Sequence, residues 1–412
     1  MYKYIIIFLC CYNSTFGSDT TIVFRQIKYS QLFEVAKKEQ KKVMLFFHFD
    51  GCSACIKMEK EVFTNRDVYE YYNSSFICFS IDILKGDGVN INKIYNVQTC
   101  PTFTYLDPIG NEVHKIVGAF SSDEFIKQGE IAYDTLNSLA GYLKRYKNGD
   151  RKSNFLRKYC YVLENANQLD SFTINQYIST LSIEDMKQFE NIKFIYEFAY
   201  HNHEQTIAFN SVAFNFMLRN RSLFNSYFDS SQVAARLVFL TLDALYNAID
   251  NKSEKVFKSA IETLKAFDGK IYIYEEIDNR ITAATDSKHL VLHAMLAYYE
   301  KNSDKNNYEK ILDKLIHSIW NESNELNSLA WNYYEKYNDE KQLTKAVNWA
   351  ARSVELKNAY ANNDTWAAIL YKLGKKNDAL ERAKIAIEIA KKEGDDFSST
   401  SKLIEKIETE NK

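Results

Sequence analysis

The segment Cys52-Ser53-Ala54-Cys55 places two thiols in the chain with two residues between them. Such a pair can cycle between a dithiol and a disulfide, can close a structural disulfide, or can supply two ligands of a tetrahedral metal site. A metal site needs two further ligands, and the sequence contains no second Cys-x-x-Cys segment. We therefore favour redox chemistry, expect no bound metal, and keep a structural disulfide as an alternative.

The flanking sequence places these thiols at the start of a helix. Val43 to Phe49 is an apolar run broken by one histidine, which is typical of a buried strand. Asp50-Gly51 predicts a turn, and Ile56 to Phe63 has a helical pattern. The free N–H groups and partial positive charge of a helix N-terminus stabilise a thiolate, which is the nucleophilic form of cysteine. This position therefore favours a reactive pair.

The chain around this motif alternates between predicted strands, turns and helices. Apolar and β-branched runs predict strands over residues 74–83, 103–106 and 112–117. Asp107 to Asn111 predicts the turn between the last two strands. A helix is expected over Ser30–Lys42 and another from Ser122 onward, with Ser30 and Ser122 as their N-caps.

This order of elements resembles the thioredoxin superfamily over residues 24–130. Four features carry the resemblance: the apolar strand, Cys-Ser-Ala-Cys at a helix start, the segment Thr99-Cys100-Pro101-Thr102, and a hairpin with the pattern Asp-Pro-x-Gly. The stretch from Cys52 to Phe63 resembles the exported bacterial branch of the superfamily more than the cytosolic one. The resemblance implies an α/β thioredoxin-like domain and an activity in thiol–disulfide exchange.

The resemblance also assigns roles to the matching residues. In this superfamily the first cysteine is exposed and attacks a substrate disulfide, while the second is shielded and resolves the mixed disulfide. Cys52 is thus the expected nucleophile and Cys55 the expected resolving thiol, and the two close an internal disulfide. Pro101 matches the family's cis-proline, so Thr99, Cys100 and Pro101 are the expected substrate-binding residues beside the thiols.

Some positions depart from the family pattern. Gly51 stands where thioredoxins usually carry a tryptophan, and Phe46 stands where they carry a buried acid that helps to move a proton off the second thiol. These changes weaken the interpretation as a fast general reductase. Cys100 lies beside the expected active site, and for it a third redox thiol, an alternative disulfide, a cluster ligand and a small packing residue all stay open.

Three further residues could bear on the thiol chemistry. His48 lies four residues before Cys52 and either stabilises the thiolate as an imidazolium or packs at the end of the strand. Cys78 lies in the middle of a predicted strand and Cys160 in a predicted helix. We expect both of these cysteines to be inert thiols in the core.

The first residues have the pattern of a secretory signal peptide. Lys3 supplies a positive charge, Ile5 to Tyr12 is a short apolar run, and small residues precede a cleavage point after Gly17. We therefore expect a periplasmic or secreted protein. Lipidation at Cys10 or Cys11 is disfavoured, because Leu9 is large where a small residue normally precedes a lipidated cysteine. A buried strand of a cytosolic protein is the remaining alternative.

The composition predicts helices for the rest of the chain. It has 12 glycines and 2 prolines, and residues 109–412 contain no proline, which would end or kink a helix. With 52 basic and 54 acidic residues the net charge is −2, so nucleic-acid binding is not expected. The sequence has no glycine-rich phosphate loop, and we expect no cofactor.

The helical part carries an internal repeat near its end. Amphipathic segments recur over residues 154–166, 173–180, 183–202, 204–218, 232–249, 253–267, 271–283, 287–301 and 305–319. Ala346 recurs 33 residues later as Ala379, and Ser353 recurs at the same spacing as Ala386. This pattern resembles tetratricopeptide repeats over residues 326–393. The expected parts are a signal peptide (1–17), a thioredoxin-like domain (18–148), an all-α helical region (149–320) and tetratricopeptide-like repeats (321–412).

These patterns together predict an exported thiol–disulfide oxidoreductase that acts on protein substrates bearing thiols or disulfides. The face of the helical repeats is expected to bind a peptide or protein, and a membrane electron donor is a candidate upstream partner. A helical stack that only solubilises or dimerises the redox domain is the alternative for this part of the chain. The alternative is a chaperone-like or adaptor protein, whose thioredoxin-like domain docks partners with little redox turnover. The sequence does not give the direction of electron flow.

Overall fold

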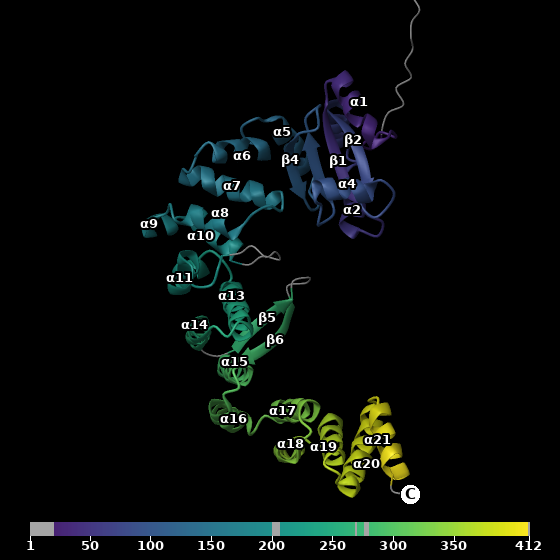
Figure 1. Cartoon of the computed structure of the whole chain (residues 1–412), viewed down its shortest axis with the longest axis vertical. Coiled ribbons are helices and arrows are strands. Elements are labelled where there is room, and N and C mark those ends of the chain that lie inside the picture. Colours follow the sequence, from purple (N-terminus) through teal and green to yellow (C-terminus); the bar gives the residue numbers. More distant parts are fainter. Residues whose placement is uncertain (1–19, 200–206, 268–269, 276–279, 411–412) are drawn as a thin grey trace, which may run out of the picture. The chain divides into compact units, whose positions relative to one another are not determined.

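The structure is a computed structural model that describes residues 20–199, 207–267, 270–275 and 280–410 (Figure 1). The predicted signal peptide, residues 1–17, lies outside the described residues. The chain divides into two compact units between Leu223 and Phe224. The domain boundaries expected near residues 148 and 320 stay predictions.

A four-stranded sheet forms the centre of the first unit. Its strands are β1 (Lys42–His48), β2 (Phe76–Asp82), β3 (Thr102–Leu106) and β4 (Glu112–Val117). They lie in the order β2-β1-β3-β4, with β1 parallel to β2 and antiparallel to β3, and with β4 antiparallel to β3. Because β1 and β2 are parallel, their carboxyl ends meet at one edge of the sheet, where the Cys-x-x-Cys segment begins. The predicted strands and the α/β class are confirmed.

Short helices surround this sheet. They are η1 (Tyr29–Gln31), α1 (Leu32–Glu39), α2 (Ser53–Lys57), the π-helical η2 (Met58–Val62), α3 (Arg66–Ser75), α4 (Gly88–Tyr95) and α5 (Ser122–Tyr133). Two predicted caps were wrong. Ser30 lies inside η1, and α5 is capped by Ser121, because the side chains of Ser121 and Glu124 form a capping box with each other's backbone.

Large aromatic side chains fill the core on one face of the sheet. Phe103 stacks on Phe46 with ring centroids 5.2 Å apart, and Phe63 packs edge-on against Phe46 at 5.1 Å. Buried Tyr72 donates its hydroxyl hydrogen bond to the carbonyl of Phe125, 2.7 Å away. The two cysteines of the Cys-x-x-Cys segment belong to the same cluster of buried side chains. The rigid packing of this core therefore fixes the base of the Cys-x-x-Cys segment.

Further helices continue the first unit beyond the sheet. They are α6 (Leu139–Lys147), α7 (Ser153–Asn165), α8 (Ser171–Ile178), α9 (Ile183–Met186), α10 (Phe189–Phe198) and α11 (Val212–Arg219), and α12 (Arg221–Asn225) spans the division. The amide of Leu139 donates to Nδ1 of His114 at 3.3 Å, which ties the start of α6 to β4. Tyr142 of α6 stacks on Phe155 of α7, with centroids 5.4 Å apart.

In its described residues, the second unit is helical apart from one hairpin. It comprises α13 (Ser230–Asp250), α14 (Glu254–Lys265), β5 (Lys270–Glu275), β6 (Arg280–Asp286), α15 (Ser287–Lys301), α16 (Lys305–Ile319) and the five helices given below. The helix predicted over residues 271–283 was wrong, because β5 and β6 pair antiparallel there. The segment Lys-Ile-Tyr-Ile-Tyr alternates β-branched and aromatic residues, a pattern that favours a strand over a helix.

The last helices follow one another across very short connections. They are α17 (Ser323–Lys336), α18 (Glu340–Leu356), α19 (Tyr360–Lys372), α20 (Lys376–Glu393) and α21 (Ser398–Glu410). Three residues separate each helix from the next as far as α20, which favours antiparallel neighbours. The predicted helical character of this region is confirmed, while its identity as tetratricopeptide repeats stays a proposal. Among the described helices, none has the length and apolarity that a bilayer crossing requires.

Candidate active site

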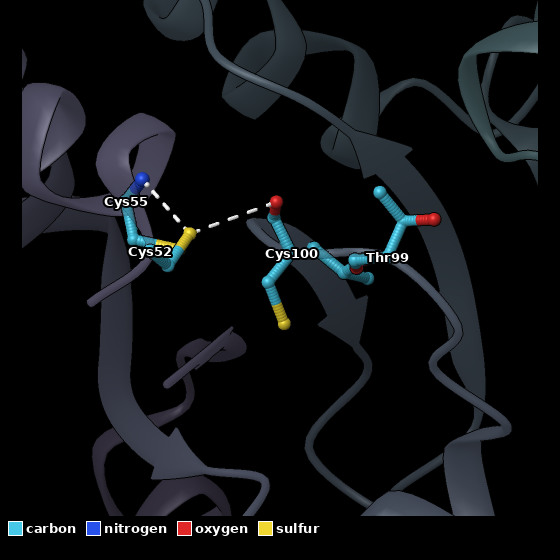
Figure 2. Close-up of a disulfide and its surroundings, with 5 residues drawn as sticks. Cys52, Cys55, Thr99 and Cys100 are labelled. Carbon is cyan, nitrogen blue, oxygen red and sulfur yellow. Dashed lines mark hydrogen bonds between the residues drawn. A yellow bond between two sulfur atoms is a disulfide. The ribbon is translucent and has the colours of Figure 1, made fainter. Parts of the chain in front are cut away.

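The two cysteines of the motif lie where β1 gives way to α2. The turn between β1 and α2 includes Gly51, whose φ of +89° favours glycine over a larger residue such as tryptophan. Cys52 caps α2, and its Sγ accepts a hydrogen bond of 3.2 Å from the amide of Cys55. The two side chains are joined in a disulfide, with Cα atoms 5.3 Å apart (Figure 2). In the reduced protein, the same amide and helix start would stabilise a Cys52 thiolate.

A loop before β3 faces the disulfide. The Cys100–Pro101 peptide bond is cis, and the Cys100 carbonyl oxygen lies 3.7 Å from Sγ of Cys52 (Figure 2). The loop is anchored on both sides of this bond. Thr102 Oγ1 donates to the Thr99 carbonyl at 2.6 Å, and the Gly118 amide donates to the Pro101 carbonyl at 2.8 Å. The structure thus brings together Cys52, Cys55 and Cys100, with Thr99 and Pro101 on either side of Cys100.

Both cysteines of the disulfide are buried, which differs from the expected exposed first cysteine. Cys52 is 6% exposed and Cys55 is 2% exposed. Cys52 packs in the cluster of buried side chains described above, and the Cys100 carbonyl lies against its sulfur. A reacting partner can therefore reach this sulfur only over a small area beside the loop.

The base of the disulfide is aromatic and contains no acid at the position where the family has one. Phe46 is 1% exposed and packs between other rings of the cluster described above. The His48 ring, one strand position further along the same face, stacks on Phe46 at 5.0 Å. A proton leaving Cys55 therefore cannot pass to a carboxylate at position 46, and it must leave by another acceptor.

An ionised acid lies at the adjacent strand end instead. Asp82 pairs in register with His48 across β1 and β2. The pKa of Asp82 is lowered, first by the hydrogen bond from the Leu84 amide at 3.0 Å and then by Lys85, whose ammonium lies 3.4 Å away. This carboxylate thus keeps its charge at neutral pH. Lys85 also pairs with Asp50 in the turn before Cys52.

The three free cysteines of the described chain are all held as thiols. Burial, followed by the charge of Asp82, raises the pKa of Cys100 to about 11. Burial likewise raises the pKa of Cys160 to about 12 and raises that of Cys78 strongly. Cys78 and Cys160 are buried and unpaired, as predicted. A thiol with such a high pKa has almost no thiolate at neutral pH, which disfavours Cys100 as an attacking group.

Residues 29–132 match the family model described as the thioredoxin-like domain. This part of the chain is a thioredoxin-like domain. The match covers a quarter of the chain and includes the disulfide, the facing loop and all four strands. The helices after α5 lie outside it.

Known proteins match the same part of the chain. The thiol:disulfide interchange protein DsbD of Haemophilus ducreyi is 30% identical over 122 residues, which are 28% of this chain and 21% of that protein. The spermatogenesis-associated protein 20 of Mus musculus is 32% identical over 65 residues, 16% of this chain and 8% of that protein. This chain therefore spans about a fifth of the first relative and less of the second.

A solved structure also matches. The solution structure of a putative disulphide-isomerase from Bacteroides thetaiotaomicron covers 28% of this chain and 96% of its own, with 28% identity and a TM-score of 0.27.

Sequence reasoning did not single out several residues that shape this site. Gly118, whose amide holds the loop, lies in a Val-Gly pair after a predicted strand, and the end of a strand next to glycine was the available signal. Lys115 on β4 is 7% exposed although lysine is rarely buried. The alternation of β4 places Lys115 with Val113 and Val117, but sequence alone does not show which segments cover that face.

Proposed function

We propose that this protein is a thiol–disulfide oxidoreductase that exchanges disulfides with protein substrates through Cys52 and Cys55. The observation that carries the proposal is the disulfide at the start of α2, which faces the carbonyl of Cys100 across 3.7 Å. The thioredoxin-like domain and the similarity to a protein named for thiol:disulfide interchange support the same activity.

The reaction has two exchange steps. In the reduced protein, the Cys52 thiolate attacks one sulfur of a substrate disulfide, so that a mixed disulfide forms and the other substrate sulfur leaves as a thiolate that takes up a proton. Cys55 then loses its proton and attacks Sγ of Cys52. This step closes the Cys52–Cys55 disulfide and releases the second substrate thiol. Two electrons pass to the substrate, and the reverse sequence donates a disulfide instead.

The loop supplies the substrate contact in this proposal. Thr99, Cys100 and Pro101 form the rim beside Cys52, and the exposed Thr99 can present its backbone to an extended substrate segment. The Cys100 carbonyl beside Sγ can accept a hydrogen bond from the Cys52 thiol when the protein is reduced.

The rest of the proposal concerns location and partners. The predicted signal peptide supports a periplasmic or secreted protein, and a membrane protein that supplies electrons is then the proposed upstream partner. The tetratricopeptide-like helices are proposed to hold a peptide or protein, and so to bring clients to the disulfide.

The test measures the redox couple in the full chain. Wild type and Cys52→Ser protein are equilibrated against glutathione, free thiols are trapped, and the masses are read. We expect one two-electron couple in wild type and none in Cys52→Ser, with reduction of a disulfide-bonded test protein falling to the uncatalysed rate. Cys55→Ser should accumulate a mixed disulfide, because the resolving thiol is missing.

The matched control is Cys100→Ser. Because burial keeps this thiol protonated, we expect the control to keep the two-electron couple of wild type. Loss of the two-electron couple in Cys100→Ser, or full turnover by Cys52→Ser, would contradict the proposed roles of these cysteines. The reduction potential of this couple also gives the direction of electron flow, since a value near −270 mV is typical of a reductase and one near −120 mV of an oxidant.

A second candidate function is a chaperone-like adaptor with little redox turnover. The low exposure of Cys52 and the aromatic Phe46 in place of an acid favour it. The full chain carrying both Cys52→Ser and Cys55→Ser separates the two functions. An adaptor keeps its suppression of client aggregation in that variant, whereas an oxidoreductase loses its effect on clients together with the thiols.

A further inference from the structure

A pocket of about 490 Å³ opens beside the redox loop, within the first unit. One wall runs from the end of α4 to Thr99, and a second is formed by β3, β4 and the turn between them. The third is the connection between α7 and α8, at Ala166, Asn167 and Gln168. Thr99 therefore belongs both to the rim of the disulfide and to the wall of the pocket. Figure 2 shows its side chain on the side of the loop that is turned away from the disulfide.

A buried ammonium group lines this pocket. Lys115 is 7% exposed, and its Nζ donates to the carbonyl of Tyr95 at 3.3 Å. An ammonium group carries three donors, and among the described residues no carboxylate lies within ion-pairing distance of this one. A buried charge is costly unless it is paired, so this lysine has the capacity for an anionic partner that the described residues do not supply.

The second charged residue of the pocket is Glu112. Desolvation of its carboxyl by the surrounding protein raises its pKa, although the residue is exposed, and the nearby Gln168 side chain opposes this shift. The positive charge of Lys115 acts in the opposite direction but less strongly. Glu112 is thus an exposed residue of the pocket wall, and among the described residues no ion pair joins it to Lys115. The remaining lining residues are uncharged.

We propose that this pocket binds a carboxylate side chain of a protein substrate, with Lys115 as the residue that pairs with it. The inference rests on the proposed function, because the pocket begins one residue away from Cys100, whose carbonyl contacts Cys52. A strand rises about 3.3 Å per residue, so an extended substrate that crosses the loop places a residue a few positions from its reactive cysteine into the pocket. The preferred substrate therefore carries Asp or Glu near that cysteine.

The arrangement gives the α7–α8 connection a role in recognition. The side chain of Gln168 lies close to Glu112, which is the only acid among the residues that line the pocket. The carboxylate of a substrate meets the unpaired donors of Lys115 and is repelled by Glu112. Removing the charge of Lys115 should therefore weaken the preference for an acidic substrate, and removing the charge of Glu112 should strengthen it.

The test uses the full-length protein and two sets of peptides. Each set contains one cysteine and carries a single Glu, or a single Gln in the matched control set, at each of the four positions on either side. In one series the cysteine forms a mixed disulfide with 2-mercaptoethanol, and kcat/KM for its reduction is measured. In the other the cysteine is replaced by serine, and Kd is measured by fluorescence anisotropy without any redox step.

We expect wild type to favour one Glu position over its Gln counterpart by about tenfold, which is the size of one charge-assisted hydrogen bond. Lys115→Met should abolish this preference, and Lys115→Arg should restore part of it. Glu112→Gln should increase the preference for Glu. Lys147→Met, at an exposed lysine of α6 outside the pocket, is the matched control, and it should keep both the wild-type preference for Glu and the wild-type rate with 2-hydroxyethyl disulfide, which has no charge.

Equal kcat/KM and equal Kd for Glu and Gln peptides at every position would overturn the subsite. A preference that survives Lys115→Met would also overturn it, by assigning the selection to another residue. Failure of the proposed function looks different. The uncharged disulfide and all peptide disulfides would then stay unreduced, while the serine peptides would still report whether Lys115 selects a carboxylate.

Discussion

The thioredoxin-like sheet and the C-terminal helices are packed with side chains of opposite size. Phe46, Phe63, Phe103 and Phe125 are at most 1% exposed in the first region. Alanines that are 0% exposed line the second, namely Ala330, Ala346, Ala350, Ala367, Ala379, Ala383, Ala386 and Ala390. Large rings fill the space between a sheet and its covering helices, whereas small side chains let two helices approach closely.

This difference in the size of the buried side chains fits the role of each region. A redox disulfide needs a fixed loop at a fixed distance, and interlocked rings beneath β1 and β3 resist displacement. Closely packed helix pairs instead form an extended surface, in which each pair contacts mainly its neighbours. The first region should therefore respond most to lost volume, and the second to added volume.

Two probes separate the regions experimentally. All four tryptophans lie between residues 320 and 366, so intrinsic tryptophan fluorescence follows the second unit. Every cysteine precedes residue 161, so thiol labelling follows the first unit. Buried Cys78 on β2 is labelled only when the sheet opens.

The largest expected effect is a loss of volume under the redox segment. Phe103→Ala should destabilise the first unit by about 3–5 kcal/mol, because it leaves a cavity between Phe46 and Phe125. The measurement is the urea dependence of Cys78 labelling. Phe172→Ala is the control, since Phe172 is 63% exposed and should change the midpoint very little. Equal shifts of the urea midpoint for the two variants would contradict the expected sensitivity of the first region to lost volume.

Added volume is the matching test of the alanine-lined helices. Ala383→Leu places a larger side chain in a fully buried position of α20 and should cost about 1–3 kcal/mol in the second unit. Tryptophan fluorescence in urea measures this cost. Lys384→Leu, the exposed neighbour on the same helix, is the control and should lie close to wild type. An Ala383→Leu variant with the stability of wild type would show that the helices do not meet at this position.

The smallest expected effect concerns pH. His114 is 2% exposed, and burial lowers its pKa below the ordinary 6.5, with the hydrogen bond to Gln128 opposing that shift. As the pH falls, the unfolded chain therefore binds a proton before the folded chain does. The stabilisation that neutral His114 contributes is complete above about pH 6.5 and is lost as the pH falls toward the folded pKa. The slope is at most about 1.4 kcal/mol per pH unit.

The measurement is Cys78 labelling in urea at several values between pH 5 and pH 8. Protonation of Nδ1 would remove the acceptor for Leu139, so acid should loosen α6 from β4. His114→Gln should flatten the pH dependence of the first unit. A profile that keeps the wild-type slope in this variant would assign the acid sensitivity to other groups.

Local patterns predicted much of the first region. The apolar run of β1, the turn at Gly51 and the cysteines at a helix start are all encoded by residues close together in the chain. Helix α3 was overlooked although its signal is local too. Asn65 accepts hydrogen bonds from the amides of Asp67 and Val68, as an N-cap does.

What the sequence did not predict depends on segments that are distant along the chain. The pattern of β4 does not show that Lys115 is buried, because its Nζ bonds to the carbonyl of Tyr95 and it lines a pocket together with the α7–α8 connection. The contact between the Cys52 sulfur and the Cys100 carbonyl likewise depends on a loop 48 residues away. The hairpin of β5 and β6 is a different case, since its alternating pattern was present but was outweighed by the helices on both sides.

The packing of α6 also sets the shortest length at which the redox domain can fold alone. A chain cut after residue 148 would keep α6 but lose Phe155 and Tyr159, the rings on α7 that stack on Tyr142. The underside of α6 would then face water, and the α7–α8 wall beside Thr99 would be gone. Limited proteolysis should therefore spare the exposed Gly149 turn and release a fragment that extends past α8.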